Sequence, residues 1–304
     1  MALATIVIPS FNHSSYVGQS IESVLRQDHP EIELLIIDDG SSDDSVELIQ
    51  SYVDQCRSTF KRFEFRSREN LGLAKTLNEA LAWATGEYFS MLSSDDTLST
   101  NKTSYLINYL ESHKEISGVF GGINQTDTIG NVTRVFNPAP GTWDFQDVLE
   151  KKCKLFAPAM LIRTEALRSV GGYWEDIALE DRSITLKLAF ADHKLATVSK
   201  PLANYRWHES NTIKQTKKMT DARLKMLEKF PEKKEIKSAK AKVLHGAARE
   251  YAAANINAAW QSYWRAIEID IYSIFSKAAY RALKKMLWNS IPFRKKTKHK
   301  VNKL

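Results

Sequence analysis

The sequence predicts an α/β fold with a Rossmann-like, mainly parallel sheet that carries helices on both faces, followed by a helical C-terminal appendage. Within the first hundred residues, short apolar strands alternate with amphipathic helices, an order typical of parallel sheets. Residues 32–38, IELLIID, form a continuous apolar run, as expected for a strand covered on both faces. After Asn211 the strand patterns stop and helical patterns follow.

The individual elements follow from the same periodicities. Strands are expected at residues 4–9, 32–38, 63–66 and 87–92, with helices at 17–27, 45–55 and 73–84. Turn residues indicate a hairpin within 119–135. Later strands are expected at 158–163 and 195–198, with a helix at 177–191 between them. Residues 214–304 are expected to be helical, with breaks at Pro231 and Pro292.

The composition is that of an ordinary globular protein. The chain has 304 residues, and 43% of them are hydrophobic, enough for a sizeable core. Cys56 and Cys153 provide neither a disulfide framework nor a metal-ligand spacing, which indicates a reducing compartment. The first residues are typical of a strand rather than a signal peptide, and no apolar run approaches the ~18 residues of a membrane span. We therefore expect a cytoplasmic protein.

Positive charge is concentrated at the C-terminal end. The net charge is +7, but residues 276–304 contain ten Lys or Arg and no Asp or Glu, so the rest of the chain is mildly acidic. One helical face is expected to be apolar and the opposite one basic, namely Tyr272, Phe275, Ala279, Leu283 and Met286 against Lys277, Arg281, Lys284 and Lys285. This pattern is typical of a helix in a membrane interface. A helix that packs its apolar stripe on the α/β domain is an equally good interpretation.

Three polar clusters follow strands that are expected to lie in one parallel sheet: Ser10-Phe11-Asn12, Asp38-Asp39-Gly40-Ser41 and Ser94-Asp95-Asp96. Ligands bind beyond the carboxyl ends of such strands. Paired acids in a loop can hold a divalent cation through oxygen ligands, or they can form a turn and a helix cap. Acids at the end of a buried strand need a partner, because burying a carboxylate is costly.

Two later clusters also combine chemistry-bearing residues. Glu180-Asp181 is expected near the start of a helix, where a carboxylate can stabilise the helix dipole or act as a general base. Tyr205-Arg206-Trp207-His208 contains a histidine that is either structural or a ligand.

Taken together, these clusters resemble family 2 glycosyltransferases of the GT-A fold in their order and spacing. The segments that carry the resemblance are IVIPSFN (6–12), IDDGSSD (37–43), NLGL (70–73), LSSDD (92–96), GGY (171–173), ED (180–181) and YRWH (205–208). The resemblance covers about residues 3–212. It implies a catalytic domain over 1–212, with a nucleotide-sugar half at about 1–97 and an acceptor half at about 98–212. Residues 213–304 are expected to form a helical region with a basic amphipathic tail.

The resemblance implies a nucleotide pocket at the first clusters. Phe11 corresponds to an aromatic residue against the base, and Asp39 to an acceptor for a base N–H, commonly of uracil. Asn70 and Gly72 border the nucleotide. The full set of implied nucleotide contacts is Pro9, Ser10, Phe11, Asn12, Asp39, Asn70, Gly72, Ser94 and Asp95.

The resemblance further implies a metal site and a catalytic base. Asp96 and His208 correspond to positions at a Mn2+ or Mg2+ ion that bridges the donor phosphates. Asp181 corresponds to the base, with Glu180 as second choice and Trp174 toward the acceptor. The sequence departs from the family at Ser93, where the family often has an acid. We therefore expect modest metal affinity, with the substrate phosphates supplying much of the coordination.

The function implied is inverting transfer of a hexosyl or N-acetylhexosaminyl group from a nucleotide diphosphate, commonly UDP. The acceptor is a saccharide or a lipid-linked hydroxyl. The expected setting is bacterial surface polysaccharide assembly (O-antigen, capsule or exopolysaccharide), with the basic tail on an anionic membrane surface at the inner face of the cell membrane.

Other classes of protein fit less well. A nucleic-acid-binding protein leaves the strand-end acids repelling phosphate, so no nucleic acid partner is expected. A nicotinamide-dependent oxidoreductase needs a G-x-G-x-x-G segment after the first strand, and none is present. A non-catalytic sugar- or nucleotide-binding module and a metal-independent transferase remain as alternatives, since Ser93 weakens the metal site.

Overall fold

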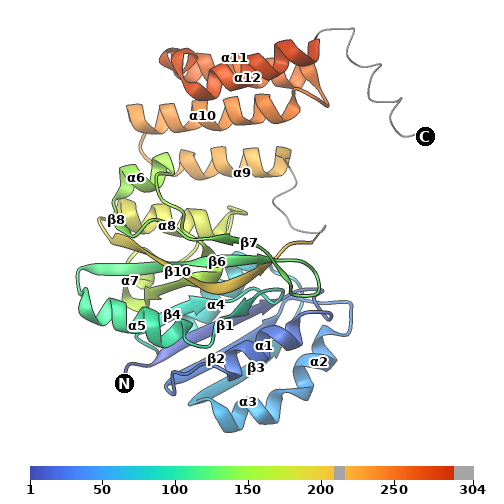
Figure 1. Cartoon of the computed structure of the whole chain (residues 1–304), viewed down its shortest axis with the longest axis vertical. Coiled ribbons are helices and arrows are strands. Elements are labelled where there is room, and N and C mark those ends of the chain that lie inside the picture. The colour runs from blue at the N-terminus through green and yellow to red at the C-terminus, as the bar shows by residue number, and fades with distance from the viewer. Residues whose placement is uncertain (209–215, 291–304) are drawn as a thin grey trace. The chain divides into compact units, whose positions relative to one another are not determined.

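The computed structural model of the chain describes residues 1–208 and 216–290. The chain divides into two compact units, Met1–Asn211 and Thr212–Leu304, called here the α/β unit and the helical unit. The strands of Figure 1 belong to the first unit, and the second consists of helices.

The sheet of the α/β unit begins with four parallel strands. β1 (Ala4–Ser10) lies between β2 (Ile32–Asp38) and β4 (Tyr88–Met91), and β3 (Arg62–Ser67) pairs with the outer side of β2. Because parallel strands end at the same edge, the loops after β1, β2 and β4 meet there.

The rest of the sheet is mixed. β9 (Met160–Arg163) is antiparallel to β4 and to β6 (Ile116–Thr126), so β6 regains the direction of β1. β10 (Lys194–Arg206) is parallel to β6 and therefore ends at the same edge. Three short strands pair antiparallel with this part of the sheet, namely β5 (Thr97–Leu98), β7 (Val132–Phe136) and β8 (Gly141–Trp143).

Helices cover the sheet because successive strand residues point to opposite faces. Ile6 and Ile8 of β1 pack in one core with residues of α1 (Val17–Leu25), α2 (Ser45–Ser51) and α5 (Lys102–Ser112). Val7 faces the other way and is fully buried, on the side where α4 (Leu73–Trp83) contacts β1. The remaining helices of this unit are α3 (Val53–Thr59), α6 (Phe145–Glu150), η1 (Ala157–Ala159), α7 (Thr164–Ser169) and α8 (Glu180–Phe190).

The helical unit has small cores of its own. It contains α9 (Thr216–Glu228), α10 (Lys234–Tyr251), α11 (Ile256–Ile269), η3 (Ile271–Phe275) and α12 (Lys277–Ser290). Ala279, Ala282 and Met286 of α12 are fully buried against α10 and α11. Part of the apolar stripe expected from the sequence therefore packs within this unit. Tyr272 and Phe275, which belong to η3, are 74% and 88% exposed.

The predicted α/β class, with helices on the sheet and a helical C-terminal part, is confirmed, although individual elements differ. Residues 45–55 form two helices, α2 and α3, instead of one. The strand expected at 195–198 is the first part of the much longer β10. The break at Pro231 lies between α9 and α10, and Pro292 lies outside the described residues. None of the helices in the described ranges has the length and hydropathy needed to cross a bilayer.

Candidate functional site

The loops after β1, β2 and β4 are joined by hydrogen bonds. Ser10 is in register with Asp38, and the Asn12 N–H donates to Ser41 Oγ at 2.8 Å. The side-chain oxygen of Asn12 accepts the Ser42 N–H, also at 2.8 Å. The third loop joins through His13, whose Nδ1 lies 2.8 Å from Ser94 Oγ. The three sequence clusters therefore form one surface at the carboxyl edge of the sheet.

Two groups at the end of β1 are available to a ligand. The Ser10 hydroxyl is buried and has no hydrogen-bond partner among the described residues. Buried polar groups are rarely left unpaired, so this oxygen is a candidate contact for a bound molecule. The Phe11 side chain is 46% exposed, which leaves its ring free to stack on a flat ligand. Asn12 adopts a left-handed backbone with φ of 53°, which asparagine tolerates better than most residues.

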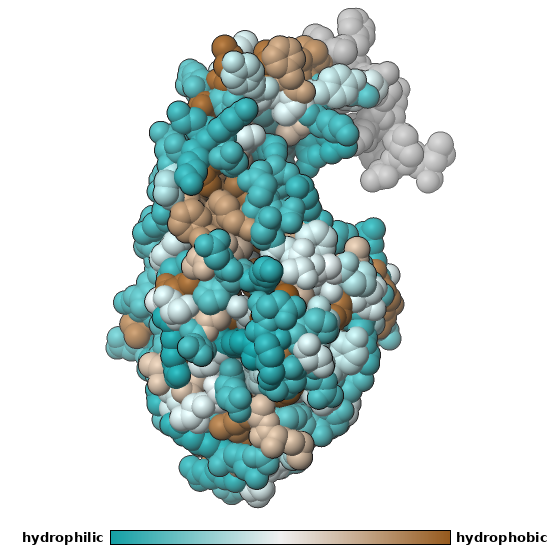
Figure 2. Space-filling view, turned by 90° about the vertical axis from the view of Figure 1, so that its left-hand side faces the viewer, coloured by the Kyte–Doolittle hydropathy of each residue, from teal (hydrophilic) through white to brown (hydrophobic). Residues whose placement is uncertain are grey.

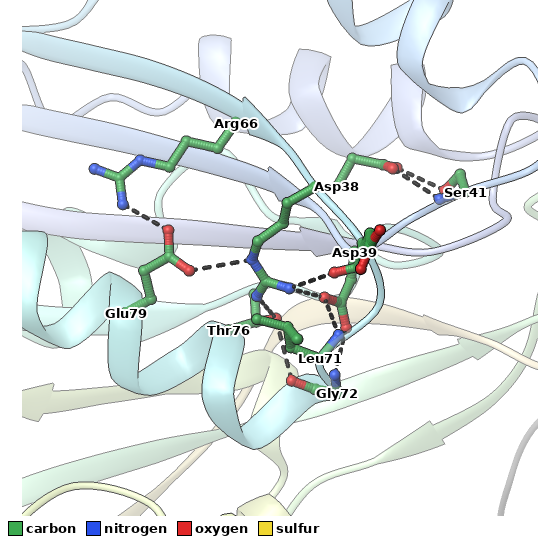
Figure 3. A network of polar contacts seen from close by, with 10 residues as sticks. Asp38, Asp39, Ser41, Arg66, Leu71, Gly72, Thr76 and Glu79 are labelled. Carbon is green, nitrogen blue, oxygen red and sulfur yellow. Dashed lines mark hydrogen bonds and ion pairs between the residues drawn. The ribbon is translucent and has the colours of Figure 1, made fainter.

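Asp39 is the centre of a polar network, shown in Figure 3. Its Oδ1 accepts from the Arg68 guanidinium and from the Leu71 N–H at 3.0 Å, and its Oδ2 accepts from the Gly72 N–H at 2.8 Å. Arg68 in turn contacts Glu79 at 3.2 Å and Thr76 at 2.8 Å. A carboxylate offers about four acceptor positions, so one remains on Oδ2 after these three contacts.

The Asp39 carboxylate therefore holds the 69–72 loop in place, and it also lies at the carboxyl edge of the sheet. Gly40 is required here, because a Cβ at this position would lie 2.8 Å from the Asn70 nitrogen and its φ is +83°. Asn70 is exposed, beside the N–H groups that bind Asp39. Asp38 has a local structural role, since its carboxylate accepts the Ser41 N–H at 2.8 Å and the Ser41 hydroxyl at 2.6 Å.

A candidate cation site lies at the same edge. One ligand-type atom from each of His13, Asp95 and His208 lies within 4.8 Å of the others. His208 Nε2 is 2.9 Å from Asp95 Oδ2. Ligands of one octahedral ion, each about 2.1 Å from it, are about 3 to 4.2 Å apart. The three side chains therefore need only small movements to close on an ion, and their nitrogen and oxygen atoms suit a divalent metal.

The histidines of this cluster are packed against aromatic rings. His208 stacks on Tyr16 with ring centroids 5.6 Å apart, and His13 meets His208 edge-on at 6.0 Å. Burial is the main influence on the His13 pKa and lowers it from its ordinary value, while the charge of Asp95 opposes this. A lowered pKa keeps the imidazole neutral near pH 7, which is the form that binds metals.

Asp96 follows Asp95 in the chain, but its carboxylate contacts Arg206 rather than His208. Its carboxylate is 1% exposed, and its Oδ1 accepts the Arg206 N–H at 2.9 Å. Burial, and then the charge of Asp95, raises the Asp96 pKa well above its ordinary value. The resemblance assigned the cation to Asp96, whereas the structure brings Asp95 against His208. The Arg206 side chain connects the acid pair to α1 and to the hairpin turn through Asp95 O, Gln19 Oε1 and Thr128 O.

Glu180 and Asp181 form the first turn of α8, as the sequence predicts. Asp181 is exposed and Glu180 is half-buried. The preceding turn is fixed by Asn78 of α4, whose amide group exchanges hydrogen bonds of 2.8 and 3.0 Å with the Tyr173 backbone. Trp174 is half-buried, with the Lys187 ammonium 5.2 Å from its ring centroid.

Sequence reasoning did not name His13 or Arg68, and it quoted Arg206 without giving it a role in the site. His13 follows the quoted first segment directly, yet nothing in the sequence places it near Asp95. Arg68 and Arg206 organise the Asp39 network and the acid pair. The available signal was charge balance: buried acids require partners, and arginine is the usual one because its fork offers several donors.

Comparison with known proteins identifies related sequences. The model of "Glycosyl transferase family 2" matches residues 5–171. An uncharacterized glycosyltransferase of Rickettsia conorii is 33% identical over 141 residues, which cover 45% of this chain and 22% of that protein. The poly-beta-1,6-N-acetyl-D-glucosamine synthase of Staphylococcus epidermidis is 26% identical over 205 residues, 63% of this chain and 47% of that protein. The chain thus spans less than half the length of these curated relatives.

Solved structures agree on the fold. TarS residues 1–349 of S. aureus, in complex with UDP-GlcNAc, aligns with a TM-score of 0.68 at 17% identity, covering 94% of this chain and 89% of that one. The mannosyltransferase PcManGT of Pyrobaculum calidifontis, in complex with GDP-Man and Mn2+, aligns with a TM-score of 0.62 at 16% identity, covering 95% and 88%. The expected GT-A architecture is confirmed by these matches. The family match over more than half of the sequence shows that this chain belongs to glycosyltransferase family 2.

Proposed function

We propose that this chain is an inverting glycosyltransferase that moves a hexosyl or N-acetylhexosaminyl group from UDP to a saccharide or lipid-linked hydroxyl, assisted by Mn2+ or Mg2+. One observation carries the proposal: the Ser10 hydroxyl, which has no hydrogen-bond partner in the part of the chain that the structure describes, and the His13, Asp95 and His208 cluster lie on joined loops at one sheet edge. The UDP-GlcNAc bound by TarS and the Mn2+ bound by PcManGT support the donor and the ion.

The nucleotide half of the site follows from the contacts at β1 and β2. The exposed Phe11 ring stacks on the base, and the Ser10 hydroxyl donates to the nucleotide. Asp39 uses its remaining acceptor position for a base N–H, while Arg68 and the 71–72 backbone hold the carboxylate in place. Pro9, Asn12, Asn70 and Ser94 shape the same pocket.

The transfer step requires one base. The acceptor oxygen forms a bond to the anomeric carbon of the sugar while the bond from that carbon to the diphosphate oxygen breaks, and the electron pair leaves with the diphosphate. Asp181 takes the proton of the attacking hydroxyl. Asp95 and His208 would hold a divalent cation, which would supply Lewis-acid stabilisation of the diphosphate charge. With a single base and no enzyme nucleophile on the opposite face, the configuration at the anomeric carbon is inverted.

A donor screen tests the proposed function. Thermal unfolding of the full chain is measured with UDP, GDP and CMP, each with MnCl2 or with EDTA. A ligand at a hundred-fold excess over its Kd stabilises the folded state by about 2.7 kcal/mol, and we expect UDP with Mn2+ to do so. Stabilising UDP-sugars are then incubated with acceptors. UDP binding without release of UDP from any sugar donor would favour the non-catalytic module, and turnover in EDTA would favour the metal-independent transferase.

Asp39→Asn should weaken UDP binding by about 1.5–3 kcal/mol, the range for a hydrogen bond to a charged group. The amide retains the size of the side chain but loses the charge, so the contact with the base N–H weakens. Calorimetric titration with UDP provides the measurement, and the choice of sugar should not change. Glu79→Gln is the matched control, because Glu79 contacts Arg68 on the side away from Asp39. Unaltered UDP affinity in Asp39→Asn would mean that the base lies elsewhere.

The proposed setting is surface polysaccharide assembly at the inner face of the cell membrane. The relationship to a poly-N-acetylglucosamine synthase supports the pathway class. The outer face of α12 supports membrane contact, because Tyr280 and Trp288, 65% and 54% exposed, share it with cationic side chains. These are Lys277, Arg281, Lys284 and Lys285, all exposed. Aromatic rings beside cations suit the interface of an anionic bilayer. Figure 2 shows apolar and hydrophilic residues intermixed on the helical unit.

Reversing three charges on α12 should release the protein from anionic vesicles. Each cation near such a surface contributes about 1 kcal/mol, so Arg281→Glu, Lys284→Glu and Lys285→Glu together should reduce vesicle binding more than a hundred-fold. Co-sedimentation with phosphatidylserine-containing vesicles gives the measurement. Lys233→Glu, Lys237→Glu and Lys242→Glu, also exposed, form a control with the same net charge. Equal losses in both triple variants would contradict a specific role for α12.

A further inference from the structure

Ser93 stands at a position where the resemblance implies an acid. The Asp95-Asp96 pair therefore lacks one carboxylate that could bind the cation. The loop after β4 carries serines at 93 and 94 before Asp95. The structure brings an imidazole from a different loop to this acid pair, because one ligand-type atom of His13 lies within 4.8 Å of those of Asp95 and His208. We infer that His13 replaces the missing acid as a third protein ligand of the divalent cation. This inference rests on the proposed metal-assisted function.

The backbone around His13 is held in place by hydrogen bonds to the residues that follow β2. The His13 N–H donates to Ser45 Oγ at 3.1 Å, and the next residue, Ser14, donates its N–H to Asp43 Oδ2 at 2.9 Å. The carboxylate of Asp43 also accepts from the Ser45 hydroxyl at 2.5 Å. The turn that carries the imidazole is therefore fixed to the loop after β2. Ligands on a rigid support bind with less loss of conformational entropy.

The orientation of the ring is fixed as well. The contact of 2.8 Å between His13 Nδ1 and Ser94 Oγ engages one ring nitrogen, which leaves Nε2 as the nitrogen for an ion. A histidine ligand usually has a hydrogen-bond partner on its second nitrogen, which sets the tautomer and the ring angle. Ser94 is 1% exposed and its carbonyl oxygen accepts from the Ser20 hydroxyl at 2.9 Å. Ser94 therefore has the position of such a supporting partner.

The ligand set has a consequence for the choice of ion. Two imidazoles and one carboxylate favour transition-metal ions that accept nitrogen ligands, strongly Co2+ and Zn2+ and to a smaller degree Mn2+, over Mg2+, which prefers oxygen ligands and retains its waters. An acid at 93 instead of His13 would make the set richer in oxygen. The replacement of an acid by His13 therefore shifts the ion preference of the site from Mg2+ toward Mn2+, Co2+ and Zn2+.

The test is calorimetric titration of the full, untagged chain with MnCl2 and MgCl2, each with and without UDP. Wild type should bind Mn2+ more tightly than Mg2+. Loss of the hydrogen-bond partner of a metal ligand costs about 10- to 100-fold in metal affinity. His13→Ala and His13→Gln remove the ligand itself and should weaken Mn2+ binding by at least as much. Adding Ser93→Asp to His13→Ala should restore cation binding and narrow the preference for Mn2+. His113→Ala, which removes an imidazole bonded to Tyr109 O on α5, is the control and should bind Mn2+ like wild type.

The outcomes separate this inference from the proposed function. Absence of cation binding to wild type, even with UDP, would contradict metal assistance itself. Normal Mn2+ binding by both His13 variants, with wild-type thermal stability, would overturn the role of His13 and leave metal assistance standing. Failure of Ser93→Asp to restore binding in the His13→Ala background would overturn the replacement of an acid by this histidine.

Discussion

Asp181→Asn should lower kcat by about 10²–10⁴-fold, the usual effect of removing a general base. The amide keeps the size of the side chain and can still accept the Arg182 N–H that Asp181 Oδ1 accepts at 2.6 Å. It cannot take a proton from an attacking hydroxyl. Donor binding should change little, because the proposed nucleotide contacts belong to the loops after β1, β2 and β4. The measurement is kcat, with the Kd for the donor determined separately.

Glu180→Gln is the matched comparison for this substitution. Adjacent residues of a helix point about 100° apart, so only one of the pair can face the acceptor. The exposure of Asp181 and the partial burial of Glu180 favour Asp181, and Glu180→Gln should cost much less in kcat. An inactive Glu180 variant beside an active Asp181 variant would reverse the two roles. Normal turnover by both would show that the base lies elsewhere.

Much of the sheet edge could be predicted because its signals are local. The apolar run of β2 and the strands on either side establish a parallel arrangement, and the carboxyl ends of parallel neighbours necessarily meet. Ser10, Asp38 and the loop before Asp95 therefore came together as expected. The start of a helix at Glu180 was also close to its predicted position, since acids favour a first turn.

The cation cluster could not be derived in the same way, because it depends on long-range topology. His208 reaches the edge only because β9 intervenes antiparallel between β4 and β6, which lets β10 run in the direction of β1 as far as Arg206. The sequence indicated just the apolar first part of β10, residues 195–198. His13 depends on a left-handed residue, Asn12, and on hydrogen bonds to the loop after β2.

The amphipathic C-terminal segment illustrates a limit of periodicity. A helical pattern shows which residues share a face but not what covers it. Ala279 and Met286 are covered by α10 and α11, whereas Tyr272 and Phe275 belong to η3 and remain exposed. The face available for a membrane is therefore the basic and aromatic one, and the predicted apolar stripe is divided between core and surface.

Asp95→Asn should abolish cation-dependent binding of UDP and lower kcat by about 10²–10³-fold, the range for loss of one electrostatic contact to the developing charge. Asp95 is the one acid in the cluster of His13, Asp95 and His208, and its carboxylate contacts His208. The substitution removes this negative charge. A neutral amide is a weaker ligand for a hard divalent ion than a carboxylate. The measurements are Mn2+ titration by calorimetry and kcat under saturating Mn2+.

Asp96→Asn distinguishes between the two carboxylates. The resemblance assigns the ion to Asp96, whereas the contact with His208 belongs to Asp95. The amide oxygen at 96 can still accept the Arg206 N–H, and burial already raises the pKa of this carboxyl group, so a neutral side chain should be tolerated without loss of thermal stability. We expect Mn2+ affinity to fall far more in Asp95→Asn than in Asp96→Asn. The reverse order would return the metal to Asp96 and would require its carboxylate to leave Arg206 when the ion binds.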